Sequence, residues 1–145
     1  QINEIMREIR YRGIGIAERK WVFGSLWFDT RNKATLIWSE ELKYWVRVDP
    51  ATVGQYTGLK DEHGKEIYEG DVIRSPLSED KTRPHRIFYH TGNAAFMGAL
   101  VDRKELCYLR LDQDWIYKFG KEVIGNIHDN PELIEKQTAE RHKTN

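Results

Sequence analysis

The stretch Gln55–Asp71, QYTGLKDEHGKEIYEGD, decides the fold, because it holds two turns and two strand entries in seventeen residues. In the first turn, Asp61 can accept a hydrogen bond from the backbone two residues further on, and Gly64 can adopt a positive φ without a Cβ clash. Gly70 lies at the centre of the second turn. The β-branched residues after Asp71 open a strand, so the stretch predicts short extended segments separated by tight turns.

Four acidic residues of this stretch allow two interpretations. Asp61, Glu62, Glu69 and Asp71 lie in or beside the two turns. We favour turn chemistry on a solvated surface, because aspartate and glycine stabilise turns. The alternative is a carboxylate cluster for metal binding or acid–base chemistry. The spacing matches none of the known ion-binding loops, so it singles out no metal.

Two runs of the sequence resemble the signature of the phage YopX protein family. They are Thr52–Asp61, TVGQYTGLKD, and Gly64–Ile73, GKEIYEGDVI. Met6–Gly13 resembles the usual N-terminus of that family, and Glu122–Leu133 resembles its usual C-terminal end. The signature residues, for which we expect a structural role, are Gly54, Gln55, Tyr56, Thr57, Gly58, Leu59, Asp61, Gly64, Ile67, Tyr68, Glu69, Gly70 and Asp71.

The resemblance implies a fold and an origin. The family is found in phage and prophage genomes and has no established activity, so it supplies no catalytic residue, metal or cofactor. This chain departs from the family at both ends, because Gln1–Ile5 precede the expected start and the tail after Leu133 is longer. We expect residues 1–133 to form a single YopX-like domain, with a tail at 134–145.

The charge balance limits the partners that the chain can bind. Lys and Arg total 23, Asp and Glu also total 23, and none of the segments 1–50, 51–130 and 131–145 has an excess of more than two charges. A general nucleic-acid binder normally carries a basic patch or tail. We therefore expect no tight non-specific binding to duplex DNA.

The single cysteine, Cys107, allows neither an intrachain disulfide nor a cysteine metal cluster. Its apolar surroundings, Leu106–Leu109, favour a buried structural thiol over a nucleophile. No apolar run approaches the roughly 20 residues of a membrane helix, and no charged-then-apolar leader is present. We expect no membrane partner and a cytoplasmic location, which means the host cytoplasm if the resemblance holds.

Short apolar runs between turn signals predict a mainly β chain. A hairpin is expected over 21–38 around the polar turn 29–33, and Asn130 with Pro131 predicts a short C-terminal helix. Strands are expected at 7–12, 21–28, 35–38, 44–48, 71–75, 85–90, 94–101, 106–111, 116–119 and 123–127.

The order of elements in residues 67–127 predicts a small SH3-like barrel. A turn leads into a strand, a long polar loop at 76–84, a hairpin and closing strands. The N-terminal strands at 7–48 would form an added sheet or hairpin, and the signature stretch at 52–73 would connect the two parts. A single mixed sandwich is the alternative.

Residues capable of catalysis are scattered along the chain. Asp112 and Asp114 could present two carboxylates on one side of an extended segment, although we favour a solvated turn. His85 and His90 are five residues apart in one expected strand, so they would lie on opposite faces. No GxSxG, P-loop, HExxH or GxGxxG motif occurs. The histidines are His63, His85, His90, His128 and His142.

The aromatic residues leave room for a binding surface. Five tryptophans in 145 residues leave room for an exposed platform of the kind found in interfaces and single-stranded nucleic-acid sites. We nevertheless expect most of the following in the core: Tyr11, Trp21, Trp27, Trp38, Trp45 and Tyr56.

Two function classes remain at this point. We favour a non-enzymatic binding module that contacts a phage or host macromolecule, with homo-oligomerisation left open. The alternative is a small metal-dependent hydrolase or nuclease that uses the carboxylates near Asp61–Asp71 or Asp112–Asp114. The missing catalytic motifs favour the first class.

Overall fold

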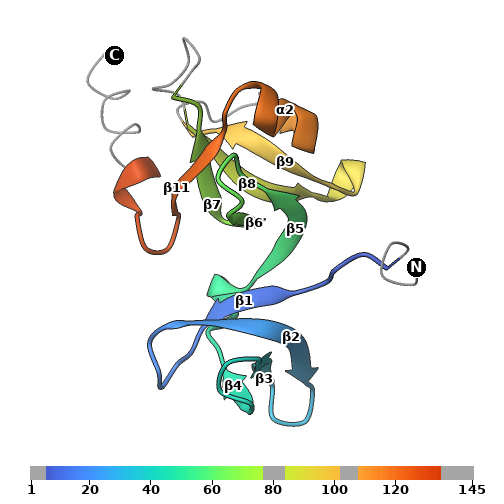
Figure 1. Ribbon diagram of the computed structural model, residues 1–145. Helices are drawn as coiled ribbons and strands as arrows, with labels where there is room; N and C mark the ends of the chain where they lie inside the picture. The colour runs from blue at the N-terminus through green and yellow to red at the C-terminus, as the bar shows by residue number, and fades with distance from the viewer. Residues whose placement is uncertain (1–5, 77–83, 102–107, 135–145) are drawn as a thin grey trace. The chain divides into compact units, whose positions relative to one another are not determined.

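The computed structural model describes residues 6–76, 84–101 and 108–134. The chain divides into two compact units, Gln1–Gly58 and Leu59–Asn145, so the boundary falls inside the signature stretch. The strands labelled in Figure 1 form two sheets. The chain is mainly β, as the sequence predicts.

The first sheet has the strand order β4-β3-β2-β1-β5-β6. β2 and β3 form the predicted hairpin, in which Ser25 is opposite Trp38. β4 then pairs with β3, and Trp45 is opposite Trp38. The 3-10 helix η1, Pro50–Thr52, leads from β4 into β5. The strands of this sheet are β1 Tyr11–Ile14, β2 Trp21–Asp29, β3 Ala34–Ser39, β4 Trp45–Arg47, β5 Gly54–Lys60 and β6 Glu66–Tyr68.

The core of the first unit lies against one face of its strands. Side chains alternate between the two faces of a strand, so Trp27, Trp38 and Trp45 lie on the face opposite the core. The buried core residues are Val22, Ile37, Val46 and Val48, and the partly buried residues packed against them are Tyr11, Leu42 and Val53.

Gly24 permits a close approach between β2 and β3. It is opposite Ser39, and a Cβ atom at this position would collide with the main-chain carbonyl oxygen of Trp38. Any larger residue would therefore force the two strands apart. A glycine inside a strand often marks such a close backbone approach.

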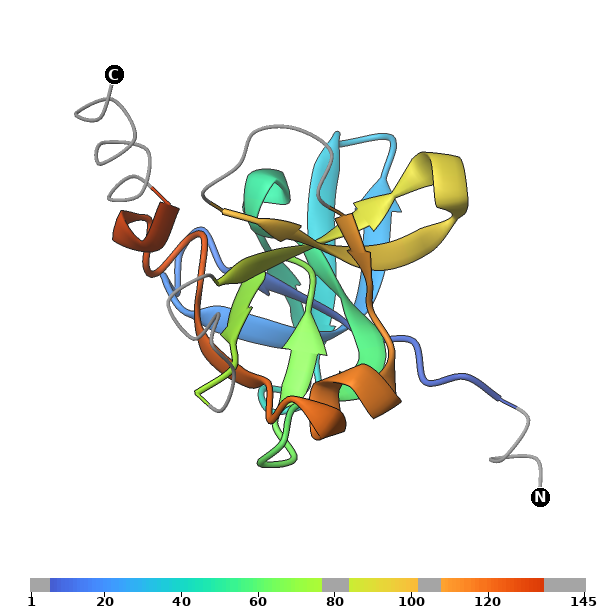
Figure 2. The same ribbon diagram turned by 90° about the horizontal axis from the view of Figure 1, so that it is seen from above.

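The second sheet has the strand order β10-β9-β8-β7-β11. β8 and β9 form the predicted hairpin, and the 3-10 helix η2, Thr91–Asn93, reverses the chain between them (Figure 1, Figure 2). The pairing of β11 with β7 contains a register shift between Val123 and Gly125. The strands of this sheet are β7 Asp71–Arg74, β8 His85–His90, β9 Ala95–Leu100, β10 Tyr108–Arg110 and β11 Glu122–Asn126.

Isoleucines dominate the core of the second unit. β6, β7, β8 and a short helix each contribute one fully buried isoleucine, so the signature stretch supplies part of this core through Ile67 and Ile73. The buried residues are Ile67, Ile73, Ile87, Leu111 and Ile116, and the partly buried residues packed against them are Leu59, Phe96, Trp115 and Val123.

The predicted strand at 116–119 is wrong, because these residues belong to and follow helix α2, Gln113–Lys118. The Asp112 side chain accepts a hydrogen bond from the Trp115 N–H at 2.8 Å, which caps the helix N-terminus. Lys118 lies in the last turn, and Gly120 follows with a φ of 58°. These are the ordinary start and stop signals of a helix, and they outweigh the apolar residues that suggested a strand.

Two further predictions need correction or are not confirmed. The first strand begins at Tyr11 instead of residue 7, because its partner β2 pairs only with Tyr11–Ile14 and the residues from Met6 to Ile9 are exposed. β10 and β11 stand at opposite ends of the second sheet, so the sheet is open and the SH3-like barrel is not confirmed. Strand count alone does not determine closure, which also depends on tilt and stagger.

Some predictions fall outside the described residues. They concern most of the loop at 76–84, Cys107 with Leu106, His142 and nearly all of the tail. The predicted C-terminal helix is described only at 132–134, which are helical directly after Pro131. Within the described segments, no helix has the length and apolar character that crossing a membrane requires.

Candidate functional site

Asp61 holds the first turn of the signature stretch together. Its carboxylate accepts hydrogen bonds from the backbone N–H groups of His63 and Lys65, both at 2.8 Å, and from that of Val123 at 3.1 Å. The residue is only 2% exposed. Because Val123 belongs to β11, this carboxylate joins the turn to a strand that is distant in the sequence.

The second turn of the signature stretch is held by hydrogen bonds of the Asp71 side chain and the Gly70 backbone. The Asp71 carboxylate accepts a hydrogen bond from the Tyr68 N–H at 2.8 Å. Gly70 has a φ of 91°, its N–H donates to the Ile87 carbonyl, and its carbonyl accepts from the Ile127 N–H, both at 2.9 Å. The turn is therefore anchored on both sides of the glycine.

The structure corrects the expectation that these acidic residues form a solvated surface. Asp61 and Asp71 are both buried, whereas Glu62 is exposed and Glu69 is half-buried. A carboxylate can be buried when backbone N–H groups replace its water, as they do at Asp61. The two aspartates therefore shape the turns.

The second pair of candidate carboxylates also has a local role. Asp112 caps α2, and Asp114 lies in its first turn, so the predicted extended segment or loop turn is instead the beginning of a helix. Both residues are exposed. Among residues 6–76, 84–101 and 108–134, no group of three or more His, Cys, Asp or Glu residues is placed to hold a metal ion.

Three histidines lie in different surroundings. His85 and His90 both belong to β8, and an odd separation places them on opposite faces of the strand. His85 is buried, and its ring centroid is 5.8 Å from that of Trp115. His63 lies in the exposed turn, where its Nε2 is 3.2 Å from a carboxylate oxygen of Glu122.

One face of strands β2, β3 and β4 carries exposed aromatic side chains, and we call it the aromatic face. Its aromatic residues are Phe23, Trp27, Trp38, Trp45 and the half-buried Trp21. Trp27 and Trp45 are 48% and 42% exposed, Phe23 is 43% exposed, and Trp38 is half-buried. The prediction of a core position is therefore wrong for Trp27 and Trp45. The core residues Val22, Ile37 and Val46 lie on the other face of these strands, so Trp27 and Trp45 project away from the core.

The tryptophan rings of the aromatic face contact one another edge to face. The ring centroid of Trp45 is 5.5 Å from that of Trp27 and 5.6 Å from that of Trp38, with interplanar angles of 62° and 70°. β2 and β4 are not neighbours, so the rings of Trp27 and Trp45 meet above β3. Such pairs contribute about 0.5–1.5 kcal/mol beyond their buried area. The contacts hold the rings in defined orientations while leaving them exposed.

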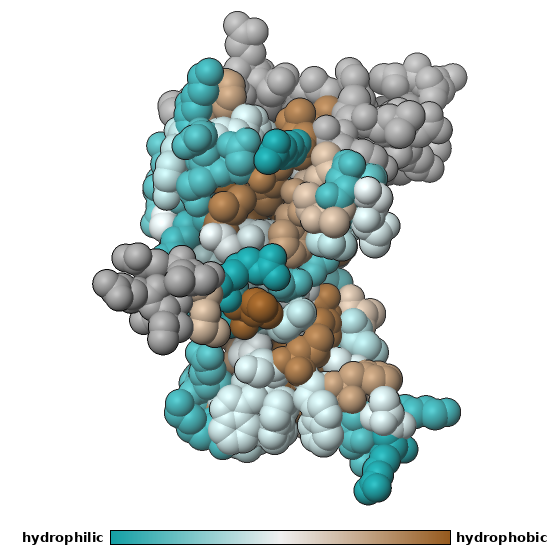
Figure 3. Space-filling model, turned by 90° about the vertical axis from the view of Figure 1, so that its right-hand side faces the viewer, coloured by the Kyte–Doolittle hydropathy of each residue, from teal (hydrophilic) through white to brown (hydrophobic). Residues whose placement is uncertain are grey.

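Residues of near-neutral hydropathy, the class that includes tryptophan, serine and threonine, gather in the lower part of Figure 3, where the first unit is drawn. A cluster of large aromatic side chains at a protein surface usually marks a contact surface, whereas a single exposed apolar residue does not. The aromatic face is a cluster of this kind.

Cations lie beside the aromatic face. Arg47 is opposite Leu36, which is opposite Trp27, so all three side chains project from the same face, and Arg47 is exposed. The turn between β2 and β3 adds two exposed cations, Arg31 and Lys33. Asp29, the last residue of β2, lies beside that turn and on the same face of the strand as Trp27.

The Asp29 carboxylate is engaged within its own turn. It accepts hydrogen bonds from the side-chain amide of Asn32 at 2.8 Å and from the backbone N–H groups of Arg31 at 3.0 Å and Asn32 at 3.4 Å. The Asn32 side chain is the main reason that the pKa of Asp29 lies below its ordinary value. Asp29 thus stays ionised and stabilises the turn that presents Arg31 and Lys33.

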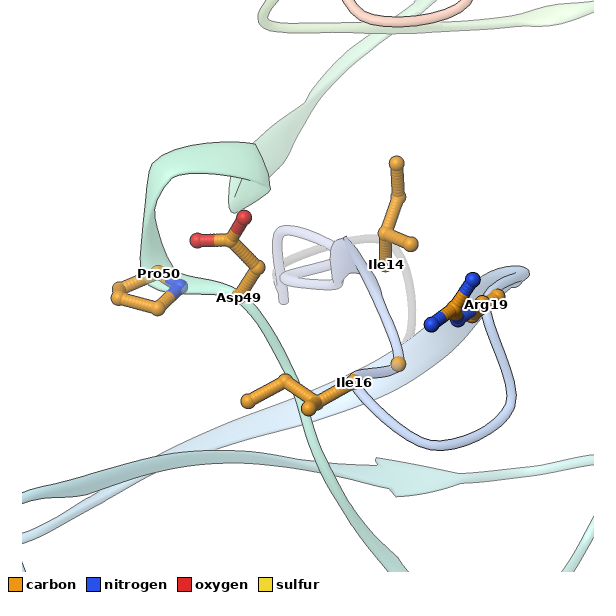
Figure 4. A pocket seen from close by; sticks show the side chains of 6 residues that line it. Ile14, Ile16, Arg19, Asp49 and Pro50 are labelled. Atoms are coloured by element: carbon orange, nitrogen blue, oxygen red, sulfur yellow. The ribbon is translucent and has the colours of Figure 1, made fainter.

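A shallow pocket of about 390 Å³ lies elsewhere in the first unit. Figure 4 shows Arg19 and Asp49 on opposite sides of it, with Ile14 and Ile16 between them. The Asp49 carboxylate accepts a hydrogen bond from the Ala51 N–H at 3.0 Å and so caps η1. The pocket combines a capping carboxylate with an exposed arginine, a pair that indicates no particular reaction.

Comparison with known protein families matches residues 10–135 to the YopX protein family. The chain belongs to the YopX family. The match confirms the resemblance that rests on the signature stretch and extends through both sheets.

This YopX chain is also similar to a solved structure. The crystal structure of protein EF1440 from Enterococcus faecalis has 25% sequence identity and a TM-score of 0.58, and the similarity covers 89% of this chain and 99% of that protein. No curated protein matches the YopX chain.

Sequence reasoning missed three features of the YopX protein at and beside the aromatic face. Residues 23, 25 and 27 alternate along β2, and this period of two could have separated an outer face from the core face. Gly24, between two aromatic runs, could have indicated the close approach to β3. The position of Arg47 beside Trp27 depends on strand register, for which the sequence holds no local signal.

Proposed function

We propose that this YopX protein is a non-enzymatic binding module of phage or prophage origin that contacts a macromolecule in the host cytoplasm through the aromatic face. The observation that carries this proposal is the exposure of Phe23, Trp27 and Trp45 on one face of one sheet. Aromatic residues, tryptophan above all, supply a large share of the binding energy at interfaces. A fixed cluster also costs little entropy when a partner binds.

The signature stretch supports a structural role for its carboxylates. The Asp61 carboxylate accepts hydrogen bonds from three backbone N–H groups. Each of these N–H groups would lose its partner if the carboxylate turned toward a metal ion or a substrate. The Asp71 carboxylate similarly accepts a hydrogen bond from the Tyr68 N–H. Nothing specific in the described residues favours the hydrolase alternative, and the binding function needs no change in these turns.

The proposal is tested with a paired variant of the aromatic face. Trp27→Ser with Trp45→Ser removes two exposed rings, and Tyr117→Ser removes an exposed ring of α2, which is 55% exposed, as the matched control. Each immobilised protein is incubated with an extract of infected host cells, and the bound macromolecules are compared. A cooperative thermal unfolding transition in calorimetry checks that each variant is folded.

We expect at least one macromolecule to be retained by the wild type and by Tyr117→Ser and to be lost from the double variant. Sedimentation of the same three proteins shows whether that macromolecule is a second copy of the chain. Identical sets of bound macromolecules for the folded double variant and the wild type would refute the proposal.

A further inference from the structure

The aromatic face offers rings on which flat partners can stack. Trp27 and Trp45 are about half exposed, and their edge-to-face contact fixes their orientation. Every nucleic-acid base has a π-face, and unpaired bases stack on exposed aromatic side chains without requiring a particular sequence. Bases inside a duplex already stack on each other and cannot reach such rings. The geometry therefore suits unpaired bases.

The charges of the aromatic face are complementary to phosphate. The strand positions that make up this face hold one cation, Arg47, and one acidic residue, Asp29 at the end of β2. With Arg31 and Lys33 of the adjoining turn, the cations outnumber this carboxylate three to one. Arg31 and Lys33 extend the positive charge into the β2–β3 turn, where the carboxylate of Asp29 is held by Asn32 and its neighbours. The strand positions are Trp21, Phe23, Ser25, Trp27 and Asp29 of β2, Ala34, Leu36 and Trp38 of β3, and Trp45 and Arg47 of β4.

Resting on the proposed function, we infer that the partner of the aromatic face is a single-stranded nucleic acid. Bases stack on Trp27 and Trp45, and Arg47 contacts the backbone phosphates beside them. A proline-rich peptide also binds aromatic side chains, but it carries no charge that would use Arg47 and the two cations of the turn. The net charge of zero still argues against tight binding to duplex DNA.

The inference predicts a shallow salt dependence. For single strands, each phosphate that a cation neutralises adds about −0.7 to the slope of log affinity against log salt. One to three cations therefore give a slope between about −0.7 and −2. A surface that binds by charge alone would need many more contacts and would show a steeper slope. Binding that is dominated by stacking is thus distinguishable from general attraction to a polyanion.

The test uses the full chain with labelled oligothymidylate and oligouridylate, and fluorescence anisotropy measures the affinity. We expect Trp45→Ala to weaken binding on the order of tenfold, while Trp45→Phe keeps most of the affinity because it retains a stacking ring. Arg47→Ala is expected to weaken binding several-fold and to reduce the salt slope by about 0.7. Tyr117→Ala is the control and should bind as the wild type does.

Four results would overturn the inference. The first is no saturable binding of either oligonucleotide below about 100 μM, which is the weak end of non-specific affinities. The second is equal affinity for duplex and single strand. The third is equal affinity of the Trp45→Ala variant and the wild type, and the fourth is a loss of binding in Trp45→Phe as complete as in Trp45→Ala.

The outcome for the proposed function is separate. If a protein is captured in a manner that depends on Trp27 and Trp45 while neither oligonucleotide binds, the inference fails and the proposed function stands. If the wild type binds an oligonucleotide and the tryptophan variants bind it equally well, the inference fails. The proposed function then fails as well unless the extract contains a partner that depends on these tryptophans.

Discussion

Gly70 shows how one residue can decide a turn of the signature stretch. Its φ of 91° lies in the left-handed region, and its N–H and carbonyl are bonded to Ile87 and Ile127. Gly64 has a similar φ of 83°, but a Cβ there would meet nothing within 4 Å and the residue is exposed. Substitutions at these two glycines therefore distinguish the energetic cost of a hydrogen-bonded, anchored backbone from the cost of a positive φ alone.

The Gly70→Val variant is expected to lose more than about 1 kcal/mol of unfolding free energy, because an L-residue at this φ is strained and its anchored backbone cannot relax. Gly64→Val should lose less, since the exposed turn can change its conformation. Chemical denaturation of both variants measures the difference. An unchanged melting temperature for Gly70→Val would mean that the turn accepts a side chain.

Asp61 carries the second prediction at this scale. Asn at position 61 keeps the size of the side chain but replaces one acceptor oxygen by an amide donor, so at least one of the three N–H groups of His63, Lys65 and Val123 loses its partner. We expect Asp61→Asn to lower the unfolding free energy by about 1–3 kcal/mol.

Glu62→Gln is the control for this variant, because Glu62 is the adjacent exposed carboxylate and a change there should stay within about 0.5 kcal/mol. Equal stability of the two variants in urea would show that the buried hydrogen bonds of Asp61 contribute nothing to the fold.

At the scale of the element, helix α2 depends on its cap. Asp112 accepts a hydrogen bond from the Trp115 N–H, and Ile116 of the same short helix is fully buried in the second core. Replacing Asp112 by alanine should therefore cost about 1 kcal/mol of unfolding free energy. The Asp112→Asn variant retains the acceptor and should cost much less, and thermal unfolding compares the two. The role of the cap is refuted if both variants melt together.

The elements that the sequence predicts correctly are those with local signals. The β2–β3 hairpin follows from two aromatic and β-branched runs around the polar turn at Asp29, and the β8–β9 hairpin follows from the turn at Thr91–Asn93. Helix α2 was missed because its six residues are too few to show a helical period, although Asp112 and Gly120 mark its two ends.

The candidate site was less predictable because it depends on distant contacts. Asp61 is buried and bonded to Val123 of β11, and Trp27 is exposed because it lies on the face of β2 opposite the core residue Val22. Neither fact has a signature within its own stretch of sequence. The resemblance to the YopX family could identify the stretch, but it could not say which face of which sheet stays exposed.

For the whole molecule, charge leads to the last prediction. With 23 basic and 23 acidic residues, the chain lacks the general positive field that draws proteins to duplex DNA. We expect no sub-micromolar affinity for random duplex DNA at physiological salt. A salt titration of duplex binding measures this affinity. Tight binding with a steep dependence on salt would show that folding gathers cations into a basic surface that is not visible in the linear sequence.

The edge-to-face contact between Trp27 and Trp45 has an optical consequence. Two indole chromophores with centroids 5.5 Å apart at an angle of 62° couple their electronic transitions, and such a pair gives circular dichroism bands of opposite sign in the far ultraviolet. The intensity of these bands depends on the mutual orientation of the rings. Trp115 is the one tryptophan outside residues 21–45, so nearly all of this signal originates in the first unit. Trp38 and Trp45, 5.6 Å apart, couple in the same way, so the protein carries an unlabelled spectroscopic reporter of whether a bound molecule has moved these three rings.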